Sequence, residues 1–197
     1  MGKWLRTDER NELISSLNMV CESVSKVNTD IEYWKWAVIA LHNSLQGSMV
    51  LALRAGNDFR IMPDKLAEKC LKAHRENKPW PKVKMDNFPN LYKKVKSTEY
   101  MHFLTCSKVL PEDEERDRAV TKLLELRNNF IHFMPQGWSL EVSGLPGIFV
   151  SLLNMANFLL FESGNVTLYE DDERSRISGA INTALSICST LRVEYEN

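Results

Sequence analysis

Three polar residues near the end of one amphipathic segment have the types that cleavage of RNA without a metal ion requires: Arg127, Asn128 and His132. That reaction needs a group that removes the proton of a 2′-hydroxyl. It also needs a cation over the charge that grows on the phosphoryl oxygens. Histidine is the side chain that titrates closest to neutral pH. Arginine stays charged, and its planar fork matches phosphate oxygens. The residue types therefore indicate chemistry on a phosphodiester.

The spacing of these three residues decides how they can act together. Asn128 and His132 stand four apart, so on a helix they share a face and the amide can orient the imidazole. Arg127 and His132 stand five apart, which is about 140° around an ideal helix. On a regular helix they cannot converge on one phosphate. Either the helix distorts near His132, or a second copy of the chain completes the site.

Residues 126–133 read LRNNFIHF. This run resembles the signature of the HEPN superfamily, in which an Arg, often followed by Asn or Asp, precedes a His by a few residues. The resemblance implies a small all-helical bundle and a metal-independent endoribonuclease that leaves a 2′,3′-cyclic phosphate and a 5′-hydroxyl. It implies that His132 transfers protons, Arg127 stabilises the transition-state phosphate and Asn128 positions His132. It also implies a homodimer with two motifs face to face, and RNA as the substrate.

The same resemblance suggests a role in bacterial defence or toxin–antitoxin control, with an antitoxin or regulatory protein as a further partner. Two alternatives stay open. Many HEPN-like domains are non-catalytic modules that bind a nucleotide, RNA or a protein partner. A polar cluster at a helix end can also be purely structural, capping carbonyls and bonding to neighbouring helices.

His42 and Gln46 form a second polar pair, four residues apart on the most apolar segment of the chain, with Asn43 beside them. Buried polar groups need hydrogen-bond partners. The pair is therefore expected either to face the Arg127–His132 region, as support for the site, or to face a subunit interface. A histidine whose bonds are satisfied within the core is the more common outcome for such a residue.

Basic residues concentrate between Lys65 and Lys96, where ten stand against three acidic ones in a chain of net charge −1. Trp80, Phe88 and Tyr92 are interleaved with these charges. Lysines for phosphates and aromatic rings for stacking are what single-stranded RNA binding uses. The residues predicted to bind RNA are Lys78, Trp80, Lys82, Lys84, Lys93 and Lys94. The alternative is a solvated face whose aromatic side chains anchor a loop.

The composition limits the other classes of function. With 25 basic and 26 acidic residues, the chain has no global field that attracts nucleic acid, so any basic surface must be local. Its 44% apolar content is typical of a globular protein. The four cysteines form no Cys-x-x-Cys pair, which indicates neither a zinc site nor a redox motif and favours a reducing compartment. We expect no metal, no cofactor and a cytoplasmic location.

The periodicity of the apolar residues predicts an all-α fold, a compact bundle of about six to seven helices. The expected helices cover about residues 7–27, 29–54, 63–75, a short stretch from 89, 111–132, 146–161 and 171 onward. The run Thr29-Asp30-Ile31-Glu32 has the pattern of a capping box for the second of these. Pro135 and Gly137 are expected to end the fifth.

The chain is predicted to be a single helical domain over residues 1–197, with a basic loop, broken by prolines, at about residues 76–88. The most apolar stretch, residues 36–53, has about membrane-spanning length. It contains His42, Asn43 and Gln46, however, and such groups are costly in hydrocarbon. We interpret it as a buried central helix and expect no association with a membrane.

Overall fold

The fold is known from a computed structural model that describes residues 2–54, 56–132, 135 and 137–196. The regular structure of these residues is helical throughout, which confirms the all-α prediction. They form eight α-helices rather than six or seven, because the four-residue helix α5 (Thr98–Met101) is too short to show an apolar period. The chain clusters into two compact units, and its status as one domain stays a prediction.

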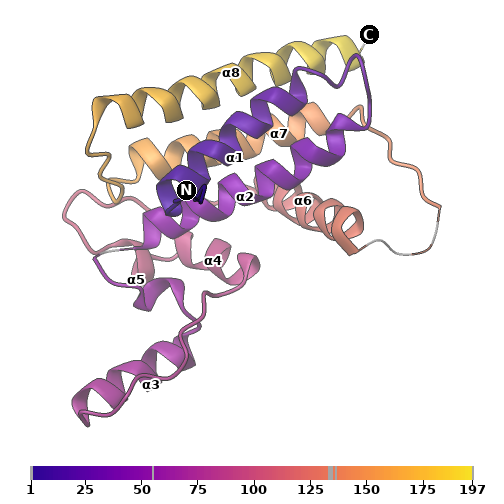
Figure 1. Cartoon of the computed structure of the whole chain (residues 1–197). Coiled ribbons are helices and arrows are strands. Elements are labelled where there is room, and N and C mark those ends of the chain that lie inside the picture. The colour runs from indigo at the N-terminus through magenta and orange to yellow at the C-terminus, as the bar shows by residue number, and fades with distance from the viewer. Residues whose placement is uncertain (1, 55, 133–134, 136, 197) are drawn as a thin grey trace. The chain divides into compact units, whose positions relative to one another are not determined.

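The first unit comprises Met1–Gly47, Asp113–Asn157 and Leu168–Asn197. Its helices are α1 (Glu9–Val24), most of α2 (Tyr33–Leu53), α6 (Glu114–His132), α7 (Leu145–Asn157) and α8 (Asp171–Glu196). Helix α8 packs against both α1 and α7, and α6 packs against α7. Figure 1 shows α1, α7 and α8 side by side.

The core of the first unit follows the apolar spacing in the sequence. In α1 the four residues at intervals of three and four are all buried: Leu13, Leu17, Val20 and Val24. In α2 the fully buried Trp34 packs its ring edge-on against Phe149, with 5.2 Å between centroids, and Trp34 Nε1 donates a hydrogen bond to Tyr195 Oη at 3.4 Å. Tryptophan is most stable in a core when its N–H finds such a partner, so this contact fixes α2 against α7 and α8.

The predicted capping box of α2 is wrong in its details. Thr29 Oγ1 donates to Lys26 O at 2.7 Å, and the acceptor for Glu32 N is Asp30 Oδ1 at 3.0 Å. Helix α2 therefore begins at Tyr33, a few residues later than expected. The physical reason is competition: a threonine hydroxyl can bond back to a preceding carbonyl as easily as it can cap the next helix.

The second unit comprises Ser48–Glu112 and Phe158–Thr167. It holds the end of α2, a 3₁₀ turn (Phe59–Ile61), α3 (Asp64–Arg75), α4 (Phe88–Val95), α5 and a π-helical turn (Phe158–Glu162). Asn165 joins three of its segments. Its Nδ2 donates to Ala52 O at 3.1 Å and to Met101 O at 3.0 Å, and its Oδ1 accepts from Ser107 Oγ at 2.5 Å.

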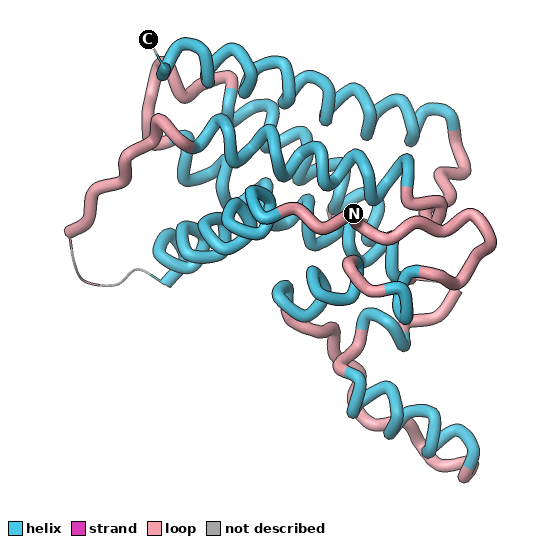
Figure 2. Tube along the Cα trace, turned by 180° about the vertical axis from the view of Figure 1, so that it is seen from behind, coloured by secondary structure: helices cyan, strands magenta, loops and turns pink. Residues whose placement is uncertain are grey.

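Helix α3 and the segment that follows it form a hairpin-like arm within the second unit. After Arg75 the chain turns, residues 78–87 contain no helix, and they run back beside α3 (Figures 1 and 2). Lys78 N donates to Ala73 O at 2.8 Å at one end of the arm, and Asp86 N donates to Ile61 O at 2.8 Å at the other. Asn87 then caps α4, since its Oδ1 accepts from Asn90 N at 2.9 Å.

Two helical stretches, Tyr33–Leu53 and Leu145–Glu162, are long and apolar enough to cross a membrane by length and composition alone. In the first, 72% of the apolar window is buried inside the structure, as in the core helix of a folded protein. This burial agrees with the interpretation of α2 as a central helix.

Candidate active site and nucleic-acid interface

Arg127 lies on α6 as a half-buried cation whose hydrogen bonds are only partly satisfied. Its Nη1 donates to Asn128 Oδ1 at 3.1 Å. Its Nε is buried and has no hydrogen-bond partner within the described part of the chain. Leaving a buried donor of a charged group without an acceptor costs free energy. A phosphate or carboxylate oxygen is the acceptor that matches a guanidinium best, and the buried Nε of Arg127 reaches such an oxygen only if the side chain or its neighbours shift.

His42 lies on α2 and is buried, with only 5% of its surface exposed. Burial lowers the pKa of His42 from 6.5 to about 4, and the charge of Arg127 contributes in the same direction. A contact of 3.4 Å between His42 Nδ1 and Asn43 Oδ1 acts in the opposite sense. At neutral pH the imidazole is therefore uncharged. Because the charge of Arg127 affects the pKa of His42, the two residues lie in one region of the first unit.

Gln46 stands one turn beyond His42 on α2 and is half-buried. Its spacing from His42 places the two residues on one face of the helix. Its role in supporting Arg127 stays a prediction.

His132 is the last residue of α6 and is exposed. Helix α6 is α-helical from Glu114 to His132, so His132 and Arg127 point about 140° apart and one chain does not bring them together. The oxygen of Asn128 accepts from Arg127, which assigns this amide to the guanidinium in the structure, whereas the sequence pattern paired it with His132.

An aromatic contact that the sequence did not predict holds the chain that follows α6. The rings of Phe130 and Trp138 lie 5.1 Å apart between centroids, although Trp138 keeps 44% of its surface exposed. Such a pair stabilises by about 0.5–1.5 kcal/mol beyond the area that it buries. It ties Trp138 to the last turn of α6, the turn that also contains His132. An aromatic residue eight positions after another gives no recognisable signal in a sequence.

The chain matches no protein-family model, no curated protein and no solved structure.

The described residues contain no group of three or more His, Cys, Asp and Glu side chains that could hold a metal ion. All four cysteines are free. Cys188 is buried in α8, and burial raises the pKa of its thiol to about 12, with a smaller contribution from Cys21. A thiol of that kind is an inert core residue rather than a nucleophile.

Five of the six residues predicted to bind RNA lie on exposed surface of the second unit: Lys78, Trp80, Lys82, Lys84 and Lys93. Trp80 keeps 48% of its surface exposed, and its ring packs against Phe59 with 5.6 Å between centroids. Lys78 pairs with Glu76 at 2.7 Å. The charges of Lys82, Lys84 and Lys93 and part of the Trp80 ring are therefore open to a partner.

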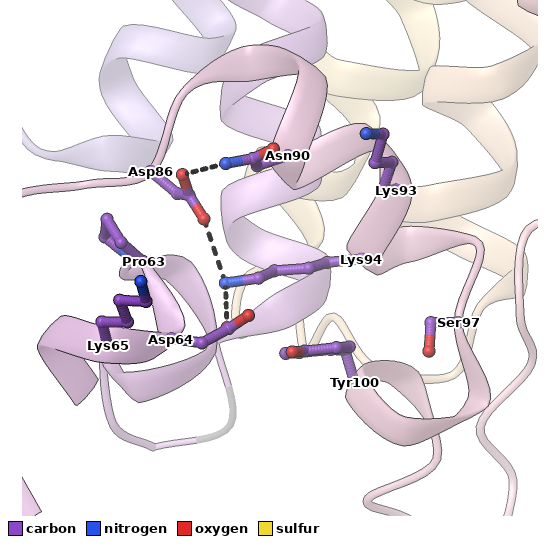
Figure 3. Close-up of a pocket in the computed structure, with 9 residues that line it drawn as sticks. All are labelled: Pro63, Asp64, Lys65, Asp86, Asn90, Lys93, Lys94, Ser97 and Tyr100. Carbon is purple, nitrogen blue, oxygen red and sulfur yellow. Dashed lines mark hydrogen bonds and ion pairs between the residues drawn. The ribbon is translucent and has the colours of Figure 1, made fainter. Parts of the chain in front are cut away.

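Lys94 does not fit the prediction, because it is buried and its ammonium group is fully used. Lys94 Nζ lies 2.9 Å from Asp64 Oδ1, 3.1 Å from Asp86 Oδ2 and 2.5 Å from Met62 O (Figure 3). An ammonium group has three donors, and these three acceptors satisfy them. Neighbouring lysines look alike in a sequence, but α4 directs Lys94 inward and Lys93 to the solvent. We therefore assign Lys94 a structural role.

The Lys94 cluster lines a surface cavity of about 400 Å³ together with Lys65, Lys93 and Tyr100 (Figure 3). Burial raises the pKa of Tyr100 to about 12, together with a hydrogen bond to Asp64 and the charge of that carboxylate. The tyrosine is therefore protonated at every physiological pH, and it contributes a neutral hydroxyl to the cavity.

We expect the free energy of unfolding of the protein to fall as the pH drops from about 6.5 to about 4. The depressed pKa of His42 means that the unfolded chain binds a proton before the folded one does. The stabilisation is complete above the unfolded pKa and is lost progressively below it, by about 3 kcal/mol in total. Urea unfolding at a series of pH values measures the effect.

His42→Leu should remove this part of the pH dependence, because leucine does not titrate. The matched control is His102→Leu, which makes the same chemical change at an exposed histidine of the second unit. An identical profile in wild type and His42→Leu would show that His42 does not titrate abnormally.

Proposed function

We propose that this protein is a metal-independent endoribonuclease of the HEPN type. The observation that carries the proposal is the state of Arg127: a half-buried guanidinium, bonded to Asn128, with an inner Nε that has no partner within the described residues. Water screens a half-buried cation less than an exposed cation. The half-buried cation therefore interacts more strongly with a phosphate. The motif that contains Arg127 adds a histidine for proton transfer.

In the proposed reaction the 2′-oxygen of the substrate attacks the adjacent phosphorus. His132 removes the proton of the 2′-hydroxyl as the new P–O bond forms, and Arg127 neutralises the charge on the non-bridging oxygens. The bond from phosphorus to the 5′-oxygen breaks, and that oxygen receives a proton, so that the net transfer is of the proton removed from the 2′-hydroxyl to the leaving 5′-oxygen. The products carry a 2′,3′-cyclic phosphate and a 5′-hydroxyl, so atoms and charge balance without any other reactant. Asn128 acts by holding the guanidinium in place.

The proposed site contains two chains. Because α6 separates Arg127 and His132 by about 140°, we assign to each site the Arg127 of one subunit and the His132 of the other, in a homodimer with two-fold symmetry. Such a dimer is self-complementary and yields two equivalent sites. The proposed setting is the cytoplasm, in bacterial defence or toxin–antitoxin control under a regulatory protein.

The test of the activity is incubation of the purified chain with total tRNA and with a structured RNA in the presence of EDTA. We expect cleavage that continues in EDTA, with 5′-hydroxyl ends that polynucleotide kinase labels without prior dephosphorylation. Fragments that carry 5′-phosphates, or cleavage that EDTA abolishes, would contradict the mechanism.

A non-catalytic RNA-binding module is the second candidate, and one observation favours it. His132 is exposed and makes no hydrogen bond within the described residues, whereas a general base is usually oriented by a third group. This candidate predicts that RNA binds to the wild-type chain and survives intact under every condition.

A further inference from the structure

The basic arm, residues 64–86, is closed at its base by a single side chain. Asp64 begins α3 and Asp86 ends the returning segment, and both carboxylates bind the ammonium group of Lys94 (Figure 3). Lys94 Nζ also donates to Met62 O, just before the arm begins. The two ends of the arm are therefore fixed at one point on α4.

The arm carries a strong positive charge. Between residues 65 and 85 it has seven lysines and arginines against two glutamates. Both Lys72 and Lys78 pair with Glu76, at 3.8 and 2.7 Å. The other basic residues make no ion pair within the described chain: Lys65, Lys69, Arg75, Lys82 and Lys84. A local excess of unpaired cations on a chain of net charge −1 favours a polyanionic partner.

The arm also exposes apolar side chains and has almost no core. Cys70 is its only fully buried residue between positions 65 and 85. Trp80, Val83, Met85 and Leu71 expose between 37% and 48% of their surfaces. Ordering the backbone of each residue costs conformational free energy, and one buried cysteine offsets little of that. A partner that covers these side chains would supply the missing stabilisation.

We infer that the basic arm is the surface that binds single-stranded RNA, the substrate class of the proposed ribonuclease; this inference depends on that proposed function. Trp80 packs against Phe59 while half of its surface stays open, which suits stacking of a base. Lys82 and Lys84 are exposed beside it to contact phosphates.

Lysines separate the exposed apolar residues of the returning segment, whose residues 82–85 read KVKM. This segment contains no helix, whereas a segment that lies in a membrane surface is usually an amphipathic helix. It therefore suits a single-stranded RNA better than an anionic lipid surface.

The test uses the full chain with Arg127→Ala, so that a fluorescein-labelled single-stranded RNA stays intact, and measures binding by fluorescence anisotropy. We expect Trp80→Ala to weaken binding about tenfold, the effect of losing one stacked base. Lys82→Gln with Lys84→Gln should lower the slope of log Kd against log salt by about 1.4, the value for two phosphate contacts on a single strand.

Matched controls are available outside the arm. Trp36 exposes 52% of its surface on α2, and Lys3 and Lys108 are exposed, so Trp36→Ala and Lys3→Gln with Lys108→Gln make equal chemical changes elsewhere. Equal losses in the arm and control variants would overturn the inference. Arm-dependent binding to phosphatidylglycerol vesicles without RNA binding would also overturn it.

The two proposals fail in different ways. Arm-dependent RNA binding by a wild-type chain that cleaves no RNA would refute the ribonuclease and leave the arm as an RNA-binding surface. Cleavage by a chain whose arm variants bind RNA as the controls do would refute the arm and leave the ribonuclease.

Discussion

Arg127→Ala is expected to lower the rate of RNA cleavage by about 10²–10³-fold, the usual effect of removing one group that stabilises transition-state charge. The half-buried guanidinium is the cation that the proposed site offers to the phosphate. Arg127→Lys keeps the charge but loses the planar fork, so its rate should lie between those of Arg127→Ala and wild type. Single-turnover cleavage of a labelled RNA measures these rates.

The matched control is Arg118→Ala, an exposed arginine on the same helix α6. It removes an equal charge and should leave the cleavage rate within twofold or so of wild type, the range expected for a distant surface change. If Arg118→Ala and Arg127→Ala lowered the rate equally, the loss would reflect net charge and the assignment of Arg127 would fall.

Mixing two inactive variants tests whether each site contains two chains. His132→Ala should also lose about 10²–10⁴-fold of the rate. After subunit exchange between Arg127→Ala and His132→Ala, half of the dimers are mixed, and in each mixed dimer one of the two sites has both wild-type residues. We therefore expect recovery to about a quarter of the wild-type rate. If each site used one chain alone, every site would lack one residue and no activity would return.

The sequence predicted most of the fold because long helices repeat their apolar residues many times. Leu13, Leu17, Val20 and Val24 give four consistent positions over α1, and all four are buried. Helix α5 has only four residues and no such repetition. The start of α2 depended on whether the Thr29 hydroxyl donates to the Lys26 carbonyl or accepts from an N–H of the next turn. Residue types do not reveal so small a difference in free energy.

The candidate site was less predictable than the fold, because it depends on which way single side chains point. The motif located Arg127 and His132, and the regular course of α6 then placed them on different sides. Lys93 and Lys94 are identical in type and adjacent, yet one is exposed and the other is buried among carboxylates. The apolar residues Phe88, Leu91, Tyr92 and Val95 define the buried face of α4. The burial of Lys94 depends in addition on Asp64 and Asp86 from other segments, which the sequence of α4 does not reveal.

Lys94→Met is expected to destabilise the second unit by about 3–5 kcal/mol, the usual cost of removing one partner from a buried ion pair. Lys94 and Asp86 expose only 6% and 5% of their side chains, so the carboxylate would be left buried without its cation. Asp64 is 61% exposed and can be solvated instead. Lys93→Met is the control, because that lysine is exposed on the same helix, and it should change stability by less than about 0.5 kcal/mol.

The destabilisation should show in two measurements. Urea unfolding measures the change in the free energy of unfolding. Limited trypsin digestion measures how readily the basic arm opens, because Lys94 fixes both ends of the arm. Adding Asp86→Asn to Lys94→Met should restore part of the stability, because the buried charge is then absent. Equal stability of Lys94→Met and Lys93→Met would contradict the assigned structural role.

The pH dependence of stability shows whether the charges of Asp86 and Lys94 stabilise the folded protein. Burial by itself raises the pKa of Asp86, but hydrogen bonds from Asn90, Lys94 and the backbone of Asn87 outweigh it, and the pKa is lowered overall. The stabilisation is therefore present above the unfolded value of about 3.9 and is lost as the pH falls through the folded one. The difference in stability between wild type and Lys94→Met should shrink in that acidic range, because a protonated Asp86 no longer needs its cation. A difference that stays constant down to pH 3 would mean that Lys94 stabilises through packing of its alkyl chain rather than through its charge.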